Sequence, residues 1–345
     1  MKSTRKINRL FQGQLAAAWL LAAINSQLFT ARVLGVPTQP GAPGTTTSDP
    51  RTPISSAPFT VSVPGSYYLT ENLTVKTGNA ITIATNGVTL DLNGFTISST
   101  AASAAGCGIL LSNTLSDITI VNGHIRSGVT NNSSGIYSGS GFAFGICYSG
   151  NAPTNVVITK VSVAGVNDGI YLGNGNGTVV EACTVTTAGN TGICASSIKN
   201  SVATDCGFMA IYGDQVADCE GISIMDWGIS AYTVLNCYGY SSMGDGGISA
   251  YTAMNCFGFA GGSGSPGIFA YAAMNCYGWS YKSVGLRATT ALNCYGYSLY
   301  SIGLSSDMAN SCYGEGVTGL SAYCANFCFG NGATPVSVTY KYNMP

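Results

Sequence analysis

The segment from Asp218 to Gly319 repeats nearly the same phrase, and this repetition constrains the fold more than any other feature of the chain. Four asparagines begin an Asn-Cys-aromatic-Gly-aromatic motif: Asn236, Asn255, Asn275 and Asn293. Six cysteines recur at intervals of 18, 19, 20, 18 and 18 residues: Cys219, Cys237, Cys256, Cys276, Cys294 and Cys312. Self-similarity at a short fixed period is typical of a solenoid, in which each repeat forms one coil.

A second phrase, Gly-Ile-Ser-Ala-Tyr and its variants, recurs at the same period and begins at Gly228, Gly247 and Gly267. Looser Gly-Ile pairs extend the repeat toward the N-terminus as far as Gly108. Short segments with a period of two, rich in β-branched and aromatic residues, begin at Phe59. No later segment long enough for a helix has a helical period, so the sequence predicts an all-β fold.

Coils of 18–23 residues with two or three short strands predict a parallel β-helix, in which equivalent positions of successive coils stack about 4.8 Å apart. Strand alternation then places Cys237 and Gly239 in the core and Tyr238 and Tyr240 on the surface. The opposite parity would bury two large rings in every coil, for which a narrow coil has no room. The hexapeptide period of left-handed helices is absent, so we expect right-handed coiling.

The asparagine before each repeated cysteine is well placed for a left-handed bend, which Asn tolerates better than most residues. Because equivalent positions stack, these asparagines are expected to form an amide ladder along the solenoid. Their side chains are expected to satisfy backbone groups of the turns.

Two passages carry a family resemblance: the opening segments Val63–Thr74 and Val88–Ile97, and the later Asn-Cys-Tyr-Gly-Tyr repeats. The first looks like the capping opening, and the second like the later coils, of exported bacterial proteins with right-handed parallel β-helix repeats. These proteins share the pectate-lyase-like superfold, and the resemblance covers residues 59–330. It implies the fold and leaves the function open, because the superfold hosts lyases, hydrolases, epimerases, adhesins and inert spacers.

The chain divides by composition into an N-terminal segment, a linker and one repeat domain. Residues 1–34 join a basic start to a ten-residue apolar run, which indicates a secretory signal peptide and is too short to span a membrane. An uncleaved amphipathic helix is the alternative. Residues 35–58 are a Pro-, Thr- and Ser-rich linker. The predicted β-helix has an N-terminal cap with the first coils (59–105), irregular coils (106–210), regular coils (211–330) and a C-terminal cap (331–345). The chain is therefore expected to be exported, to the cell surface or the extracellular space.

Charged residues make up 8% of the chain and the net charge is −1, so no basic surface for nucleic acid is expected. The thirteen cysteines follow the coil period, lack the spacing of zinc ligands and accompany a single histidine, His124. We therefore expect buried thiols that act as small core residues, no metal site and no cofactor.

The acidic residues concentrate in one region, where Asp214, Asp226 and Asp245 are the candidates for a catalytic pair. Glycosidic cleavage needs two carboxylates that flank one bond. No Lys or Arg lies between Lys199 and Lys282 to hold an acidic substrate. We therefore interpret these carboxylates as solvated turn residues, with a polysaccharide lyase or glycoside hydrolase of the same superfold as the alternative function.

Outward aromatic side chains beside the repeated cysteines form the predicted binding surface. Rows of rings about 4.8 Å apart make a patch larger than monomers usually expose. The candidate binding residues are Tyr238, Tyr240, Phe257, Phe259, Tyr277, Trp279, Tyr295 and Tyr297. Stabilisation of the ladder alone, stacking of sugar rings and packing against another copy are the three interpretations of this surface.

These observations predict a non-catalytic exported rod with a structural, adhesive or glycan-binding role. The expected partner is a polysaccharide or a cell-surface glycan, bound by the aromatic rows. A self-assembling extracellular fibre subunit is the third hypothesis, because low charge gives weak repulsion between copies.

Overall fold

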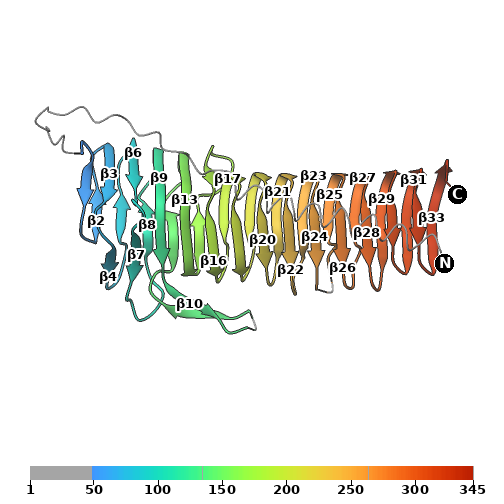
Figure 1. Cartoon of the computed structure of the whole chain (residues 1–345), viewed down its shortest axis with the longest axis horizontal. Helices are drawn as coiled ribbons and strands as arrows, with labels where there is room; N and C mark the ends of the chain where they lie inside the picture. The colour runs from blue at the N-terminus through green and yellow to red at the C-terminus, as the bar shows by residue number, and fades with distance from the viewer. Residues whose placement is uncertain (1–48, 134, 263, 345) are drawn as a thin grey trace, which may run out of the picture. The chain divides into compact units, whose positions relative to one another are not determined.

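The computed structural model describes residues 49–344 apart from Ser134 and Ser263, and these residues form stacked coils of β-strands with no helix among them (Figure 1). It follows that no described helix is long and apolar enough to cross a membrane. The predicted signal segment, 1–34, and most of the predicted linker lie outside the described residues.

Each coil passes through three ladders of parallel strands in the same order. The first ladder starts with β2 (Phe59–Val61), β5 (Ile81–Ile83), β8 (Cys107–Leu111), β12 (Phe144–Tyr148) and β14 (Asp168–Tyr171). The second starts with β1 (Thr52–Ile54), β3 (Gly65–Leu69), β6 (Val88–Asp91) and β15 (Val179–Glu181), and it includes the first halves of two long strands, β9 (Ser116–Arg126) and β13 (Thr154–Val166).

From the sixth strand of the first ladder onward, one longer strand serves the first and second ladders together. These strands are β17 (Ile193–Lys199), β19 (Ile211–Ala217), β21 (Trp227–Leu235), β23 (Gly246–Met254), β25 (Ile268–Met274), β27 (Leu286–Leu292), β29 (Ile302–Asn310), β31 (Thr318–Asn326) and β33 (Thr334–Tyr342).

The third ladder completes each coil. It holds β4 (Leu73–Val75), β7 (Thr96–Ser99), the second halves of β9 and β13, β16 (Thr184–Ala188), β18 (Val202–Cys206), β20 (Glu220–Ser223), β22 (Tyr238–Ser241), β24 (Phe257–Ala260), β26 (Tyr277–Ser280), β28 (Tyr295–Ser298), β30 (Tyr313–Glu315) and β32 (Phe329–Asn331). The predicted all-β, parallel β-helix is confirmed, with regular coils of about 18 residues, and its right-handed coiling stays a prediction.

The core is a set of stacked inward positions whose side chains become smaller along the chain. In the early coils it contains Ile and Leu, for example Ile81, Leu90 and Ile109, all fully buried. In the regular coils the inward positions are occupied mainly by Cys, Gly, Ala, Ile and Leu. Cys237 and Gly239 point inward while Tyr238 and Tyr240 point outward, as predicted. Small inward residues let a coil of about 18 residues close without voids.

A strand precedes the predicted start of the β-helix at residue 59. β1 lies within the segment 35–58 that was interpreted as linker, and it pairs in parallel with β3. Ile54 is buried in the core, and Arg51 donates a 2.8 Å hydrogen bond to Asp91. A three-residue strand with a proline at its centre has too little periodicity to be recognised in the sequence.

An antiparallel hairpin interrupts the coils within the region 106–210 that was predicted to be irregular. It is formed by β10 (Gly128–Asn131) and β11 (Tyr137–Ser140), and Figure 1 shows it leaving the side of the stack. The carboxylate of Asp205 holds it against the coils, accepting hydrogen bonds from Asn131 Nδ2 at 2.7 Å and from the Tyr137 hydroxyl at 2.8 Å.

The predicted asparagine ladder is present. Asn236, Asn255, Asn275 and Asn293 have φ between 52° and 54°, in the left-handed region. Each of the last three donates from Nδ2 to Oδ1 of the asparagine before it, at 3.0, 3.1 and 3.4 Å. In these bonds the side chains satisfy one another, whereas the prediction had them bond to the backbone of the turns.

Candidate functional site

The predicted binding residues form two columns of stacked rings on the outer face of the third ladder. The Tyr238 column has centroid distances of 5.3, 4.9, 4.7 and 5.2 Å, and it contains Tyr238, Phe257, Tyr277, Tyr295 and Tyr313. The Tyr240 column has distances of 4.7, 4.3 and 5.8 Å, and it contains Tyr240, Phe259, Trp279 and Tyr297. Adjacent planes lie within 12° of each other, so each ring covers a face of the next.

This stacking limits what the two columns offer to a ligand. All their rings are half-buried except Tyr238, which lies at one end of its column and is exposed. A sugar ring packs against an aromatic face, and in the interior of a column the faces are taken by neighbouring rings. The geometry is therefore that of a stabilising ladder with ring edges toward solvent.

A third column is more accessible. Tyr232, Tyr251 and Tyr271 stack at 4.8 Å with planes within 7°, and their exposed fractions are 61%, 46% and 51%. They come from the Gly-Ile-Ser-Ala-Tyr phrase, in which Tyr follows a core-facing Ala on β21, β23 and β25. These tyrosines were not among the binding residues predicted from the sequence.

The Tyr232 column leads into a groove of about 850 Å³ on strands β23 to β33. Its floor is a row of small inward residues, Ala250, Ala270, Ala288, Ser306 and Ala322, followed by Val338. One rim carries Tyr251, Tyr271, Thr289, Asp307, Tyr323 and Thr339, and the other carries Phe269, Arg287, Ser305, Ser321 and Ser337. The groove lies where small side chains stack between two rows of more exposed ones. The repeat predicts that these positions stack, but it does not show that the surface between the two rows is concave.

The three acidic candidates do not form one site. Asp226 and Asp245 occupy equivalent positions on neighbouring coils, because Trp227 pairs with Gly246 in the register of β21 and β23. Asp214 lies on another face of the coil, where it accepts hydrogen bonds from the Gly175 N–H at 2.8 Å and from Asn174 Nδ2 at 3.3 Å.

Asp226 is buried, which corrects the interpretation of a solvated turn residue. Burial raises the pKa of its carboxyl and the charge of Asp245 adds to the rise, although the hydrogen bond from the Trp227 N–H at 2.7 Å opposes it. Asp245 is exposed. In the part of the chain that the structure describes, no three metal-ligating side chains are arranged to hold a cation. A catalytic role for these carboxylates stays a hypothesis.

The repeated cysteines are buried as small core residues, as predicted. Their thiols donate to the backbone carbonyl two residues earlier, as from Cys237 Sγ to Leu235 and from Cys256 Sγ to Met254, both at 3.0 Å. Burial raises the pKa of Cys183 and Cys194 to about 11, which makes these thiols poor nucleophiles at neutral pH.

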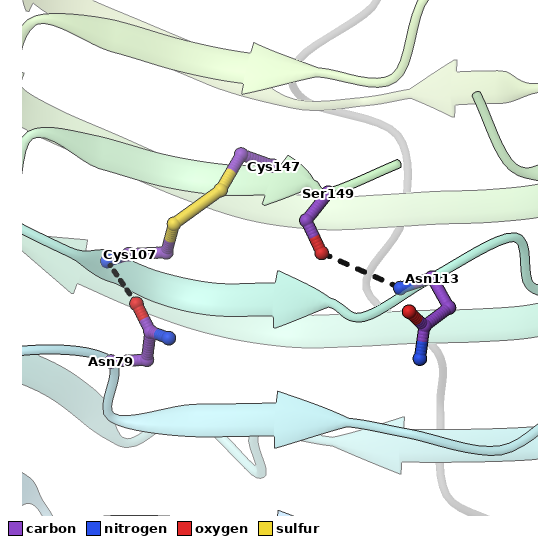
Figure 2. The surroundings of a disulfide bond; sticks show 5 residues. All are labelled: Asn79, Cys107, Asn113, Cys147 and Ser149. Carbon is purple, nitrogen blue, oxygen red and sulfur yellow. Dashed lines mark hydrogen bonds between the residues drawn. A yellow bond between two sulfur atoms is a disulfide. The ribbon is translucent and has the colours of Figure 1, made fainter. Parts of the chain in front are cut away.

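A disulfide that was not predicted from the sequence joins Cys107 on β8 to Cys147 on β12 (Figure 2). The two strands are neighbours in the first ladder and enclose the hairpin insertion. Nearby, the Cys107 N–H donates to Asn79 Oδ1 at 2.9 Å. Both cysteines lie among the irregular coils, where the repeat gives no register and therefore no indication of which cysteines meet.

No protein-family model matches the chain, and no curated protein matches it. Among solved structures, the chain is similar to the A-module of a mannuronan C-5 epimerase from Azotobacter vinelandii. The identity is 14%, the match covers 80% of this chain and 72% of that chain, and the TM-score is 0.32. At these values the likeness carries no argument about the ligand or activity of this chain.

Proposed function

We propose that this chain is a non-catalytic exported β-helix protein that binds glycan along the groove on β23 to β33. The observation that carries the proposal is the groove itself, which combines a small-residue floor with an exposed rim of tyrosines. Binding sites for small ligands are typically concave and lined by aromatic side chains with a few polar groups. A pyranose ring has apolar C–H faces and polar edges, so it matches such a lining.

The groove is a better glycan site than the two columns beside the cysteines. The rings stack on one another in all three columns, but those beside the cysteines are mostly half-buried, whereas Tyr232, Tyr251 and Tyr271 are exposed. The Tyr238 and Tyr240 columns are then assigned to stability, since offset-stacked pairs contribute about 0.5–1.5 kcal/mol each.

Two further observations support the rest of the proposal. Asp214 lies away from Asp226 and Asp245, which favours a non-catalytic role over a lyase or hydrolase. The disulfide between Cys107 and Cys147 favours export, because disulfides persist mainly in oxidising compartments.

The experiment compares two tyrosine variants for retention on immobilised polysaccharides. Tyr271→Ala removes an exposed ring at the groove and is expected to weaken binding about tenfold. Tyr277→Ala removes a ring inside the Tyr238 column and is expected to lower the free energy of unfolding by about 2–3 kcal/mol, with affinity of the folded protein unchanged. Loss of binding in Tyr277→Ala alone, or no retention of the wild type on any polysaccharide, would contradict the proposal.

Self-association is a second candidate function, favoured by exposed apolar residues in the turns that follow third-ladder strands. These residues are Phe208, Met225, Met243, Leu299, Tyr300 and Val317. Apolar patches of this kind on soluble proteins often mark contact surfaces. Light scattering over a range of concentrations tests it, and a constant monomer mass would reject it.

A further inference from the structure

The Tyr232 column stops at Tyr271, and tyrosine returns at the same position three coils later. Ala270 pairs with Ala288, then Ser306, then Ala322 in the strand register. The next positions therefore read Tyr271, Thr289, Asp307 and Tyr323 along the rim. At about 4.8 Å per coil, the two tyrosines are about 14 Å apart and two short side chains lie between them.

We call this interruption of the rim, at Thr289 and Asp307, the Thr289 notch. It differs from the rest of the rim in the aromatic rings that lie at its two ends. Within the column each ring covers its neighbour, but the side of Tyr271 that faces Thr289 has no ring stacked on it among the described contacts. Tyr323 is 59% exposed at the other end and touches Tyr340 edge-on rather than face to face. The notch thus has an aromatic ring at each end.

The floor beneath the notch changes at the same coil. Ser306 lies at the position where the neighbouring coils have alanine, and it is 8% exposed. Its hydroxyl is the one buried side-chain polar atom without a hydrogen-bond partner in the part of the chain that the structure describes. Buried polar atoms are nearly always satisfied, so this hydroxyl is an exception in the core beneath the notch.

Two opposite charges border the notch. Asp307 is exposed on the tyrosine rim, and Arg287 is exposed on the other rim with its guanidinium 5.9 Å from the centre of the Phe269 ring. Among the described residues, the salt bridges involve Arg51 and not these two side chains. A carboxylate and a guanidinium each form pairs of parallel hydrogen bonds, which suit neighbouring hydroxyl groups of a sugar.

We infer that the Thr289 notch is a subsite for one or two pyranose rings of a neutral saccharide, an inference that rests on the proposed function. Tyr271 and Tyr323 pack against the apolar faces of the sugar, and Asp307 and Arg287 bind its hydroxyls. The charges of Asp307 and Arg287 balance, so a chain of uronates would bring carboxylates beside Asp307 without a surplus of positive charge to hold them.

The decisive variant fills the notch. Thr289→Tyr continues the existing column of rings from Tyr271, so the protein is expected to fold, and the added ring occupies the space assigned to the sugar. Affinity is expected to fall at least tenfold, as measured by isothermal titration calorimetry on the full chain. Gln215→Tyr adds the same ring at an exposed position of β19 outside the groove and is the matched control, with affinity unchanged.

The ligands are hexasaccharides of glucose, mannose, galactose and xylose, and a hexamer of galacturonate as the acidic comparison. The expected result is that a neutral hexamer binds the wild type with little dependence on salt and that Thr289→Tyr weakens this binding at least tenfold. Asp307→Asn is expected to weaken that binding about tenfold, because it removes hydrogen bonds to a charged group.

Three outcomes count against these ideas in different ways. If Thr289→Tyr binds as the wild type does, the notch is not the subsite, and the proposed function of the groove stands. If the galacturonate hexamer binds more tightly than every neutral one, the assignment to neutral sugars is wrong. If the wild type binds no saccharide, the subsite and the proposed function both fail.

Discussion

Nδ2 of Asn255 donates a hydrogen bond to Oδ1 of Asn236, 3.0 Å away on the preceding coil. Both residues lie in the left-handed region, with φ of 54° and 53°. One residue type therefore meets two requirements of the solenoid: it tolerates the bend after each long strand, and it links the bends of successive coils. Asn275 continues the chain of amides with a donation to Asn255 at 3.1 Å.

Replacing Asn255 separates these two contributions. Asn255→Gly keeps the left-handed backbone accessible and removes two side-chain hydrogen bonds, each contributing about 0.5–1.5 kcal/mol. Asn255→Ala removes the same bonds and lowers the free energy of unfolding by about 1–2 kcal/mol more, because the left-handed conformation is unfavourable for a residue with a Cβ atom. Urea unfolding is expected to rank the wild type above the Gly variant and the Gly variant above the Ala variant. Equal stability of the two variants would show that the bend carries no conformational cost.

Much of the regular part of this fold was predictable because its information is local. Alternation along a strand is enough to place Cys237 inside and Tyr238 outside, and the period then copies that assignment to every equivalent coil. The left-handed bend at Asn236 follows from the residue type in the same way.

The features that sequence reasoning missed depend on contacts between distant segments. Asp205 holds the hairpin across a separation of 68 residues to Tyr137, and the disulfide crosses the insertion with a separation of 40 residues. The candidate site moved from the rings beside the cysteines to the groove on β23 to β33 for a different reason. Both sets of rings face outward, but only the structure shows that the rings beside the cysteines are mostly half-buried, whereas the exposed ring of Tyr271 borders a groove.

Thiol titration tests the burial of the cysteines. Eleven cysteines are free, and ten of these are buried while Cys324 is half-buried. A buried thiol is both inaccessible and poorly ionised, since the thiolate is the reactive form. We expect one thiol to react with a chromogenic disulfide reagent in the native protein and eleven to react in denaturant. Rapid reaction of several native thiols would contradict the buried column.

Loss of the disulfide is expected to destabilise the irregular coils. Cys107 and Cys147 close a loop with a sequence separation of 40, for which the loop-entropy relation gives about 4 kcal/mol as an upper figure. The Cys107→Ser, Cys147→Ser double variant should therefore unfold at lower urea concentration than the oxidised wild type. Reduction should lower the stability of the wild type to that of the variant and leave the variant unchanged. A variant as stable as the oxidised wild type would refute this prediction.

Asp226 gives the stability a predictable dependence on pH. The folded state raises the pKa of its carboxyl, mainly by burial, whereas the unfolded chain has the ordinary value of about 3.9. Between the two values the folded state binds the proton more tightly, so the free energy of unfolding falls as pH rises through this interval. Asp226→Asn stays neutral and is expected to be more stable than the wild type at neutral pH.

The same comparison in acid is the control for Asp226. Below the pKa of the unfolded chain both proteins are neutral at this position, so the advantage of Asp226→Asn should shrink as pH falls. Asp245→Asn removes only the repulsion between the two carboxylates, which is a minor cause of the raised pKa of Asp226. It should therefore raise the free energy of unfolding at neutral pH by less than Asp226→Asn does. A gain of equal size at acidic and neutral pH would mean that packing, and not ionisation, causes it.

The last prediction concerns the hairpin of β10 and β11, which the carboxylate of Asp205 attaches to the coils. Its Oδ1 accepts from Asn131 and Tyr137, and its Oδ2 accepts from Thr187 Oγ1 at 2.9 Å. Asp205 itself has a φ of 53°, so Asp205→Gly removes the carboxylate without straining the backbone. Tyr137→Phe removes one of the three bonds and is the milder variant.

Because the hairpin pairs with none of the three ladders, its detachment should leave most of the solenoid intact. Hydrogen bonds to a charged group contribute about 1.5–3 kcal/mol, so loss of one raises the detached population about tenfold or more. Cleavage by thermolysin within residues 128–140 is expected to be fastest in Asp205→Gly, intermediate in Tyr137→Phe and slowest in the wild type, with similar melting temperatures. If Asp205→Gly is cleaved no faster than the wild type, the apolar contacts of the hairpin and not this carboxylate hold it in place.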